Sequence, residues 1–307
     1  MSDLYADRLS AAVQKKKSAV CVGLDPVFDR LPPSIREGLD LSDPLEAGAQ
    51  AIETFCRRVC ELVADDAATV KLQMAYFERF GPPGMRAARN VALAARELGL
   101  IVIGDIKRGD IGSTVGAFAD AYFGETRVGD VSAEAFPWDA VTLSPYMGSD
   151  SIRPFLDACR DRGKGLYVLV RTSNPSSKEI QELPSDGSPV FHHVARLVDE
   201  WGREYRGASG FSSVGAVVGA TFPRELAEAR ERMPHTPFLV PGVGAQGATA
   251  ADVSAAFDSA GDGAVVNSSR GILYAYEKGE PGDWEDAVVQ ATRRLRDELQ
   301  AALPVDA

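Results

Sequence analysis

The chain has 307 residues, of which 45% are hydrophobic and 25% are charged, and its formal net charge at pH 7 is −11. These proportions are typical of a folded globular protein and exclude a chain that is mainly disordered. The net negative charge disfavours nucleic acids and anionic membranes as main partners, because both attract basic surfaces. No apolar run approaches the roughly 18 residues of a membrane span, and the opening residues MSDLYADRLS do not resemble a signal peptide. We therefore expect a cytoplasmic protein.

Short apolar runs, rich in β-branched residues, recur along the whole chain. Each is apolar throughout rather than alternating, which is typical of parallel strands covered on both faces. Segments with apolar residues at three- and four-residue spacing lie between them and predict helices. The predicted strands cover residues 19–24, 69–72, 100–106, 140–143, 166–170, 214–218, 238–240 and 264–266. The predicted helices cover residues 45–64, 84–98, 151–162, 224–233, 248–260 and 283–302.

Eight strands that alternate with helices, at roughly 30 to 35 residues per unit, predict an α/β fold of the (β/α)₈ TIM-barrel type. We expect a single domain over residues 1–307, with the barrel proper at about 19–302 and an extra N-terminal helix over 1–17. An open, doubly wound sheet is the alternative. The loop 172–189, after the fifth predicted strand, is long and polar, which is typical of a lid or a binding loop.

Charged residues gather where the predicted strands end, which is the active-site face of such a barrel. Side chains alternate along a strand, so Asp105 and Lys107 are expected to point the same way, and Asp110 follows after a glycine. A lysine between carboxylates stays protonated, so Lys107 is interpreted as a fixed cation and possible proton donor. Lys71 and Asp25, from the second and first strands, could extend this array. For these charges alone, a salt-bridge network that ties strand ends together is the alternative interpretation.

The loops after the seventh and eighth predicted strands indicate a phosphate site, as is frequent in these barrels. The seventh loop is rich in glycine and contains Gln246, and the eighth supplies Arg270 at the start of a helix. Backbone N–H groups and a guanidinium suit a phosphate dianion. A tight turn with a surface arginine is the alternative. The same loop matches the dinucleotide pattern G-x-G-x-x-G, but that match alone is weak, and the next strand does not end in the acid that an NAD site requires.

These motifs together resemble the orotidine 5′-phosphate decarboxylase family. The resemblance rests on the D-x-K-x-x-D motif at 105–110, GLDP at 23–26, Lys71, PGVGAQG at 241–247 and the late Arg-Gly pair at 270–271. The segments KLQMAYFERFG, GDIKRGDIGST, TLSPYMGSDS and LVRTSNP are similar to the longer bacterial subgroup, and the likeness runs from about residue 21 to 271. It implies decarboxylation of orotidine 5′-monophosphate to uridine 5′-monophosphate and CO₂ in pyrimidine biosynthesis, with no metal or other cofactor.

The resemblance also implies roles for the catalytic residues. Lys107 would protonate C6 of the pyrimidine, and Asp105 would lie beside the departing carboxylate. Asp110, with Ile111 and Thr114 nearby, would reach into the site of a neighbouring subunit. The expected assembly is therefore a homodimer with active sites shared across the interface.

The remaining implied residues bind the substrate. Asp25 and Lys71, the latter also counted with the catalytic array, would hold ribose hydroxyls. Ser173 would contact the pyrimidine edge, although the adjacent Thr172 is an alternative. The loops after the seventh and eighth strands would contribute Pro241, Gln246 and Arg270, of which the last two would grip the phosphate.

Two other functions remain open from the sequence. One is a different lyase on a phosphate-binding barrel, such as a metal-dependent hexulose-phosphate synthase. The other is a nucleotide-binding or scaffold protein that kept the barrel and lost the chemistry. In the favoured interpretation the partner is a small nucleotide substrate, and neither nucleic acid nor a membrane is expected.

Overall fold

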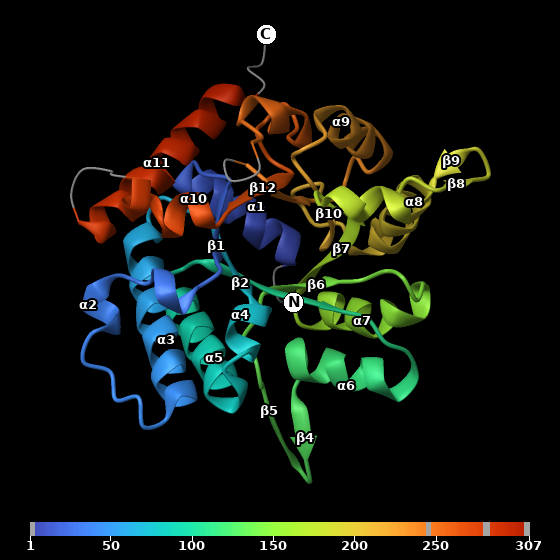
Figure 1. Ribbon diagram of the computed structural model, residues 1–307. Coiled ribbons are helices and arrows are strands. Elements are labelled where there is room, and N and C mark those ends of the chain that lie inside the picture. The colour runs from blue at the N-terminus through green and yellow to red at the C-terminus, as the bar shows by residue number, and fades with distance from the viewer. Residues whose placement is uncertain (1–3, 244–246, 279–282, 304–307) are drawn as a thin grey trace.

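The computed structural model describes residues 4–243, 247–278 and 283–303. Eight parallel strands close into a barrel in the spatial order β1-β12-β11-β10-β7-β6-β3-β2, and helices surround it (Figure 1). This confirms the predicted TIM barrel and excludes the open sheet. The barrel strands are β1 Val20–Leu24, β2 Thr69–Gln73, β3 Ile101–Arg108, β6 Ala140–Leu143, β7 Gly165–Arg171, β10 Val214–Val218, β11 Phe238–Pro241 and β12 Ala264–Ser268.

The longer helices pack around the barrel and bury an apolar side, as in α3 and α5. The α-helices are α1 Tyr5–Lys16, α2 Pro33–Arg36, α3 Pro44–Val63, α4 Met74–Glu78, α5 Gly81–Glu97, α6 Gly112–Tyr122, α7 Arg153–Asp161, α8 Val190–Gly202, α9 Pro223–Arg232, α10 Arg270–Leu273 and α11 Trp284–Ala302. The 3₁₀ turns are η1 Phe28–Arg30, η2 Ser149–Ser151, η3 Pro175–Glu179, η4 Arg203–Tyr205, η5 Ala251–Ala256 and η6 Ala275–Lys278. Within the described ranges, no helix is long and apolar enough to cross a membrane.

One predicted helix is wrong. Residues 248–260 form only the short 3₁₀ helix η5, and Phe257 already has an extended backbone. The carboxylate of Asp258 accepts hydrogen bonds from the backbone N–H groups of Ala260 and Asp262. Such a local side-chain bond competes with helical hydrogen bonding, which explains why the helix does not continue.

Helix α1 packs against the N-terminal end of the barrel, opposite the expected active site. Tyr5 is fully buried, and its hydroxyl lies 3.0 Å from the hydroxyl of Tyr167 on β7. A Cβ atom at Gly165 would lie 2.1 Å from the Tyr5 ring, so only glycine permits this close approach. The N-terminal helix is therefore packed into the fold.

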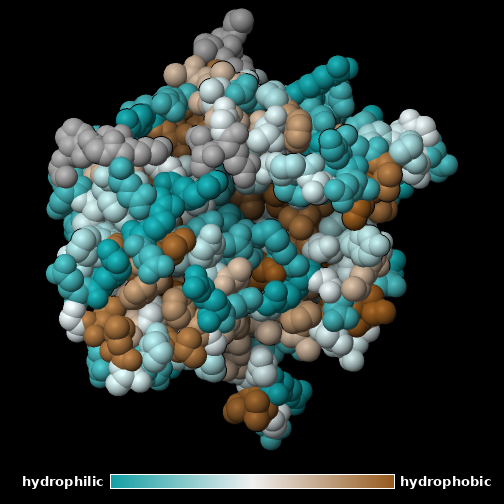
Figure 2. Space-filling model, in the orientation of Figure 1, coloured by the Kyte–Doolittle hydropathy of each residue, from teal (hydrophilic) through white to brown (hydrophobic). Residues whose placement is uncertain are grey.

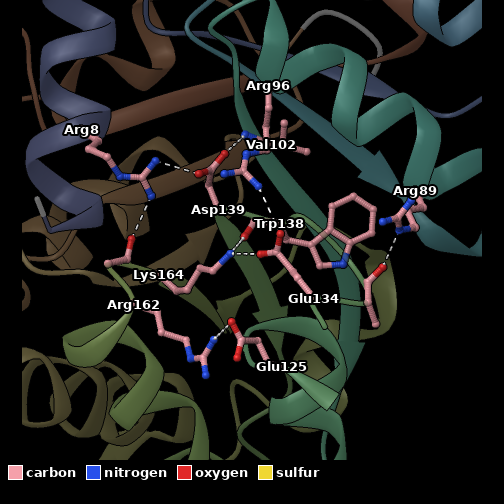
Figure 3. A network of polar contacts seen from close by, with 12 residues as sticks. Arg8, Arg89, Arg96, Val102, Glu125, Glu134, Trp138, Asp139, Arg162 and Lys164 are labelled. Atoms are coloured by element: carbon pink, nitrogen blue, oxygen red, sulfur yellow. Dashed lines mark hydrogen bonds and ion pairs between the residues drawn. The ribbon is translucent and has the colours of Figure 1, made fainter. Parts of the chain in front are cut away.

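Two short hairpins, which the sequence analysis did not predict, extend from the barrel. One joins β4 Thr126–Val128 to β5 Val131–Ala133 and projects at the lower edge of Figure 1, and the other joins β8 Pro184–Ser185 to β9 Ser188–Pro189 within the loop 172–189. An isolated two-stranded hairpin is marginally stable, so contacts at its base matter. At the base of β4–β5, Lys164 donates to the carboxylate of Glu134 and to the carbonyl of Trp138, at 2.9 and 2.7 Å (Figure 3).

Candidate active site

A cavity of about 280 Å³ lies at the C-terminal ends of the barrel strands. Figure 2 shows a hollow near the middle of this face. Most of the predicted site residues line the cavity, namely Asp25, Lys71, Asp105, Lys107, Ser173, Pro241 and Arg270. They come from segments spread over almost 250 residues of sequence, and the closure of the barrel brings them together.

A row of alternating charges forms the floor of the cavity. The ammonium nitrogen of Lys71 lies 2.9 Å from Oδ2 of Asp105, and that of Lys107 lies 2.5 Å from Oδ1. Gln73 also donates to Oδ2 of Asp105 at 2.9 Å. The side chains of Lys71 and Asp105 are 5% and 6% exposed, whereas that of Lys107 is 45% exposed. Of these two ammonium groups, that of Lys107 is therefore the more accessible to a ligand in the cavity.

The charges of this row stabilise one another. Burial alone would raise the pKa of Asp105, but the ammonium groups of Lys71 and Lys107 outweigh it and hold the pKa of that carboxyl well below its usual range. Burial alone would lower the pKa of Lys71, but the carboxylates of Asp105 and Asp25 raise it above its ordinary value. At neutral pH the site thus holds an ionised carboxylate beside a protonated, buried lysine.

The backbone of β3 changes direction at Lys107. Gly104 pairs with Val141 and Arg108 with Leu143, so four steps along β3 match two along β6. Lys107 has a φ of 46°, in the left-handed region that side-chain-bearing residues rarely adopt. This bulge lets Lys107 extend over the cavity while Asp105 stays beneath it.

Thr142 on β6 supports this bulge, a role that no sequence motif predicted. Its side-chain oxygen lies 2.7 Å from Oδ1 of Asp105 and accepts a hydrogen bond from the backbone N–H of Lys107 at 3.0 Å. Its hydroxyl proton is therefore free to be donated to the carboxylate. Thr142 is 1% exposed and stands in an ordinary apolar strand sequence, which gives no local signal of this role.

Asp25, which follows β1, is held in place by residues that follow β12. The hydroxyl of Ser269 donates to Oδ1 of Asp25 at 2.9 Å. The hydroxyl of Tyr274 donates to the Asp25 carbonyl at 2.9 Å and accepts from the backbone N–H of Val27 at 2.7 Å. A Cβ atom at Gly23 would lie 2.0 Å from the Ser269 hydroxyl, so this approach requires glycine. The turn that carries Asp25 is thereby fixed.

The residues after β7 form another wall of the cavity. Thr172, Ser173 and Asn174 all line it. The hydroxyl of Thr172 is already engaged, since it donates to Asn174 at 2.6 Å and accepts from Gln181 at 2.7 Å. The Ser173 hydroxyl makes no hydrogen bond within the described residues, so it is the better placed of the two to bind a ligand.

The predicted phosphate residues are only partly described. Pro241, the last residue of β11, and Arg270, the first of α10, line the same cavity. Arg270 is exposed and makes no ion pair within the part of the chain that the structure describes. Gln246 lies outside the described residues.

Asp110, Ile111 and Thr114 do not line the cavity of their own chain. The carboxylate of Asp110 accepts a hydrogen bond from the backbone N–H of Ile111 at 2.8 Å. Ile111 and Thr114 are exposed. Within one chain, Lys107 therefore lies beside one carboxylate, that of Asp105, and not between two as the sequence predicted. The chain turns away from the cavity after Gly109, so Asp110 does not reach this site.

No cluster of three or more histidine, cysteine, aspartate or glutamate side chains in the described ranges is arranged to hold a metal ion. The polar groups of the cavity are instead lysines, an arginine, amides, hydroxyls and two carboxylates. This set of side chains suits an anionic organic ligand with several polar substituents.

Known proteins are similar to this chain over almost its full length. The sequence profile of the orotidine 5′-phosphate decarboxylase / HUMPS family matches residues 18–282. An orotidine 5′-phosphate decarboxylase from Rhodopirellula baltica is 44% identical over 304 residues, which cover 96% of this chain and 99% of the relative. One from Caldicellulosiruptor bescii is 36% identical, with 97% and 99% covered. The structure of Leishmania donovani OMP decarboxylase superposes with a TM-score of 0.74 at 32% identity, covering 97% of this chain and 98% of the other.

Proposed function

Because the chain belongs to the orotidine 5′-phosphate decarboxylase family, we propose that the row Lys71–Asp105–Lys107 is the machinery with which it converts orotidine 5′-monophosphate to uridine 5′-monophosphate. The reaction is a step of pyrimidine biosynthesis, and the enzyme is a carboxy-lyase. The observation that carries the assignment is an exposed ammonium group held over a buried, ionised carboxylate at the floor of the cavity. A metal-dependent hexulose-phosphate synthase is not favoured, since the curated relatives are named as orotidine 5′-phosphate decarboxylases.

The chemistry follows from these charges. The bond between C6 and the carboxylate breaks, CO₂ leaves, and the electron pair stays on C6. The Lys107 ammonium lies where it stabilises this negative charge, and it transfers a proton to C6 to give the product. The amine of Lys107 then regains its proton from water. Asp105, held by Lys71, Gln73 and Thr142, keeps the ammonium oriented so that little reorganisation is needed.

The rest of the substrate extends from this centre along the cavity wall. Asp25 and Lys71 bind the ribose hydroxyls, and Ser173 binds the pyrimidine edge. Arg270 binds the phosphate together with Gln246, and Pro241 lines the passage between phosphate and base. Binding energy from the remote phosphate is expressed in the transition state, because it holds C6 against Lys107.

Substitution of Lys107 tests the assignment. We expect Lys107→Ala to abolish turnover of orotidine 5′-monophosphate, while Lys15→Ala, at an exposed lysine of α1, leaves turnover unchanged. Both variants are compared by circular dichroism so that misfolding is recognised. We also expect wild-type turnover to persist in a metal chelator. Turnover by Lys107→Ala close to that of the wild type would refute the role of this lysine.

The second part of the proposal is a homodimer in which Asp110, Ile111 and Thr114 complete the partner's site. Half of the large apolar side chains that are exposed in the described residues lie between positions 111 and 147, and Figure 2 shows hydrophobic surface at the tip of the β4–β5 hairpin, at the lower edge. The side chains in this part of the chain are Ile111, Val128, Val131, Tyr146 and Met147. Their exposure supports burial against a second copy.

The four cysteines are all free, which supports a reducing compartment, the cytosol. The whole chain is assigned to one barrel domain.

Mixed dimers test the shared site. Lys107→Ala and Asp110→Ala subunits are each expected to be inactive, and a refolded equal mixture should regain about one quarter of wild-type activity, because half of the dimers hold one intact site. The dimer itself is measured by light scattering. If heterodimers form and no activity returns, Asp110 does not act across the interface.

A further inference from the structure

Arg171, the last residue of β7, is fully buried beneath the loop 172–189. Its guanidinium donates to Glu225 of α9 at 2.5 Å, and it also contacts three side chains of the loop. These are the Ser177 hydroxyl at 2.6 Å, the Gln181 side-chain oxygen at 3.4 Å and the Glu182 carboxylate at 2.5 Å. A buried cation is costly unless it is paired, so these contacts tie the loop to the barrel in one arrangement.

Gln181 transmits this arrangement to the wall of the cavity. Its side-chain oxygen accepts the backbone N–H of Thr172 at 2.9 Å, and its side-chain nitrogen donates to the Thr172 hydroxyl at 2.7 Å. The same oxygen faces Arg171, which fixes the orientation of the amide group. Gln181 thus holds Thr172, the residue before Ser173 in the cavity wall, by two hydrogen bonds, which we call the clamp.

We propose that Gln181, oriented by Arg171, is a positioning residue that sets the segment Thr172–Ser173–Asn174 for recognition of the pyrimidine base. Gln181 itself does not line the cavity, so it acts through Thr172 rather than on the ligand. The inference rests on the proposed contact between Ser173 and the base. It predicts that affinity for the base depends on a residue eight positions further along the loop.

Two ligands separate this role from a merely structural one. Uridine 5′-monophosphate carries base, ribose and phosphate, whereas ribose 5-phosphate lacks the base. Loss of the clamp should weaken binding of the first and leave binding of the second unchanged. General damage to the fold would weaken both.

The experiment compares Gln181→Ala with Glu179→Ala in the full-length enzyme, by calorimetric titration with both ligands. Glu179 is an exposed residue of the same loop. Since Gln181→Ala removes two hydrogen bonds to Thr172, we expect uridine 5′-monophosphate to bind about 10- to 30-fold more weakly. Ribose 5-phosphate should bind as in the wild type, and Glu179→Ala should change neither affinity. Steady-state kinetics should show a raised KM for orotidine 5′-monophosphate in Gln181→Ala.

A third variant, Ser173→Ala, separates failure of this inference from failure of the site assignment. If Ser173→Ala selectively weakens the base-containing ligand and Gln181→Ala does not, the clamp is refuted and the site assignment stands. If Gln181→Ala is selective and Ser173→Ala is not, the clamp is supported and the base contact belongs to Thr172 or Asn174. If neither variant is selective, or if Gln181→Ala weakens both ligands equally, the inference is overturned.

Discussion

Replacement of Thr142 by valine isolates the contribution of one buried hydroxyl to the position of Lys107. Valine has almost the same shape as threonine, so the change removes the hydroxyl and leaves little cavity. Two interactions are lost, the 2.7 Å contact with the Asp105 carboxylate and the 3.0 Å bond from the Lys107 N–H. Asp105 keeps its contacts with Lys71, Gln73 and Lys107, so its charge remains paired.

The expected magnitude follows from the kinds of bond that are lost. A hydrogen bond to a charged group contributes about 1.5 to 3 kcal/mol, and an N–H group left unpaired away from water costs about 1 to 3 kcal/mol. Part of the lost interaction free energy lowers the free energy of unfolding. The rest appears in the reaction, because the hydroxyl no longer holds the left-handed backbone of Lys107 in place. If about 2 to 3 kcal/mol is added to the activation barrier, kcat falls by roughly 30- to 150-fold.

The assay follows the loss of the orotate absorbance at saturating substrate, with thermal unfolding measured in parallel. Thr142→Ser keeps the hydroxyl and is the matched control, so we expect its kcat to stay within a few-fold of the wild type. A kcat for Thr142→Val within threefold of the wild type would refute the argument that this hydroxyl places Lys107. So would an equal loss in Thr142→Ser, because then the methyl group and not the hydroxyl would matter.

Three further predictions concern the turn at Asp25, the base of the barrel and the thiols. Tyr274→Phe removes only the hydroxyl that bridges the turn at Asp25, so KM for orotidine 5′-monophosphate should rise about tenfold with the fold intact, by the loss of two hydrogen bonds. Asp139→Ala removes the hydrogen-bond acceptor for Arg8 and for a backbone N–H of β3 (Figure 3). Chemical denaturation should therefore show a free energy of unfolding that is lower by about 2 to 4 kcal/mol, with little change in kcat. All four thiols are buried, and burial raises the pKa of Cys21 to about 11, so a disulfide reagent at pH 8 should react only after denaturation.

Much of the fold is predictable here because of the way a parallel barrel buries its strands. Strands covered on both faces are apolar throughout, so runs such as 214–218 stand out in the sequence. The hairpins β4–β5 and β8–β9 have strands of three and two residues, too short to show a period, and the β4–β5 strands are wholly exposed. Nothing local to those segments distinguishes them from loop.

The predicted strand ends indicate most of the residues that line the cavity, whereas the contacts between these residues follow from the sequence only where they are close together. Alternation along β3 places Asp105 and Lys107 on one side, and the 2.5 Å contact between them confirms that placement. The bulge and Thr142 depend on how β3 pairs with β6, which no local pattern encodes. Likewise, Gln181 reaches Thr172 because Arg171 draws the loop back onto the barrel, and the sequence shows only that the loop is long and polar.

A net charge of −11 is compatible with an anionic substrate, because the charges on the protein surface and those that line the cavity act over different distances. Within the described lining of the cavity, Lys71, Lys107 and Arg270 outnumber Asp25 and Asp105, so the cavity carries a local excess of one positive charge. At physiological ionic strength, exposed charges are screened over about 8 Å, whereas the partly buried groups of the cavity are screened much less. A ligand inside the cavity therefore experiences mainly these five groups, while an extended polyanion would experience the acidic surface as well. The net negative charge of the chain is thus compatible with the binding of a small phosphate ester in the cavity.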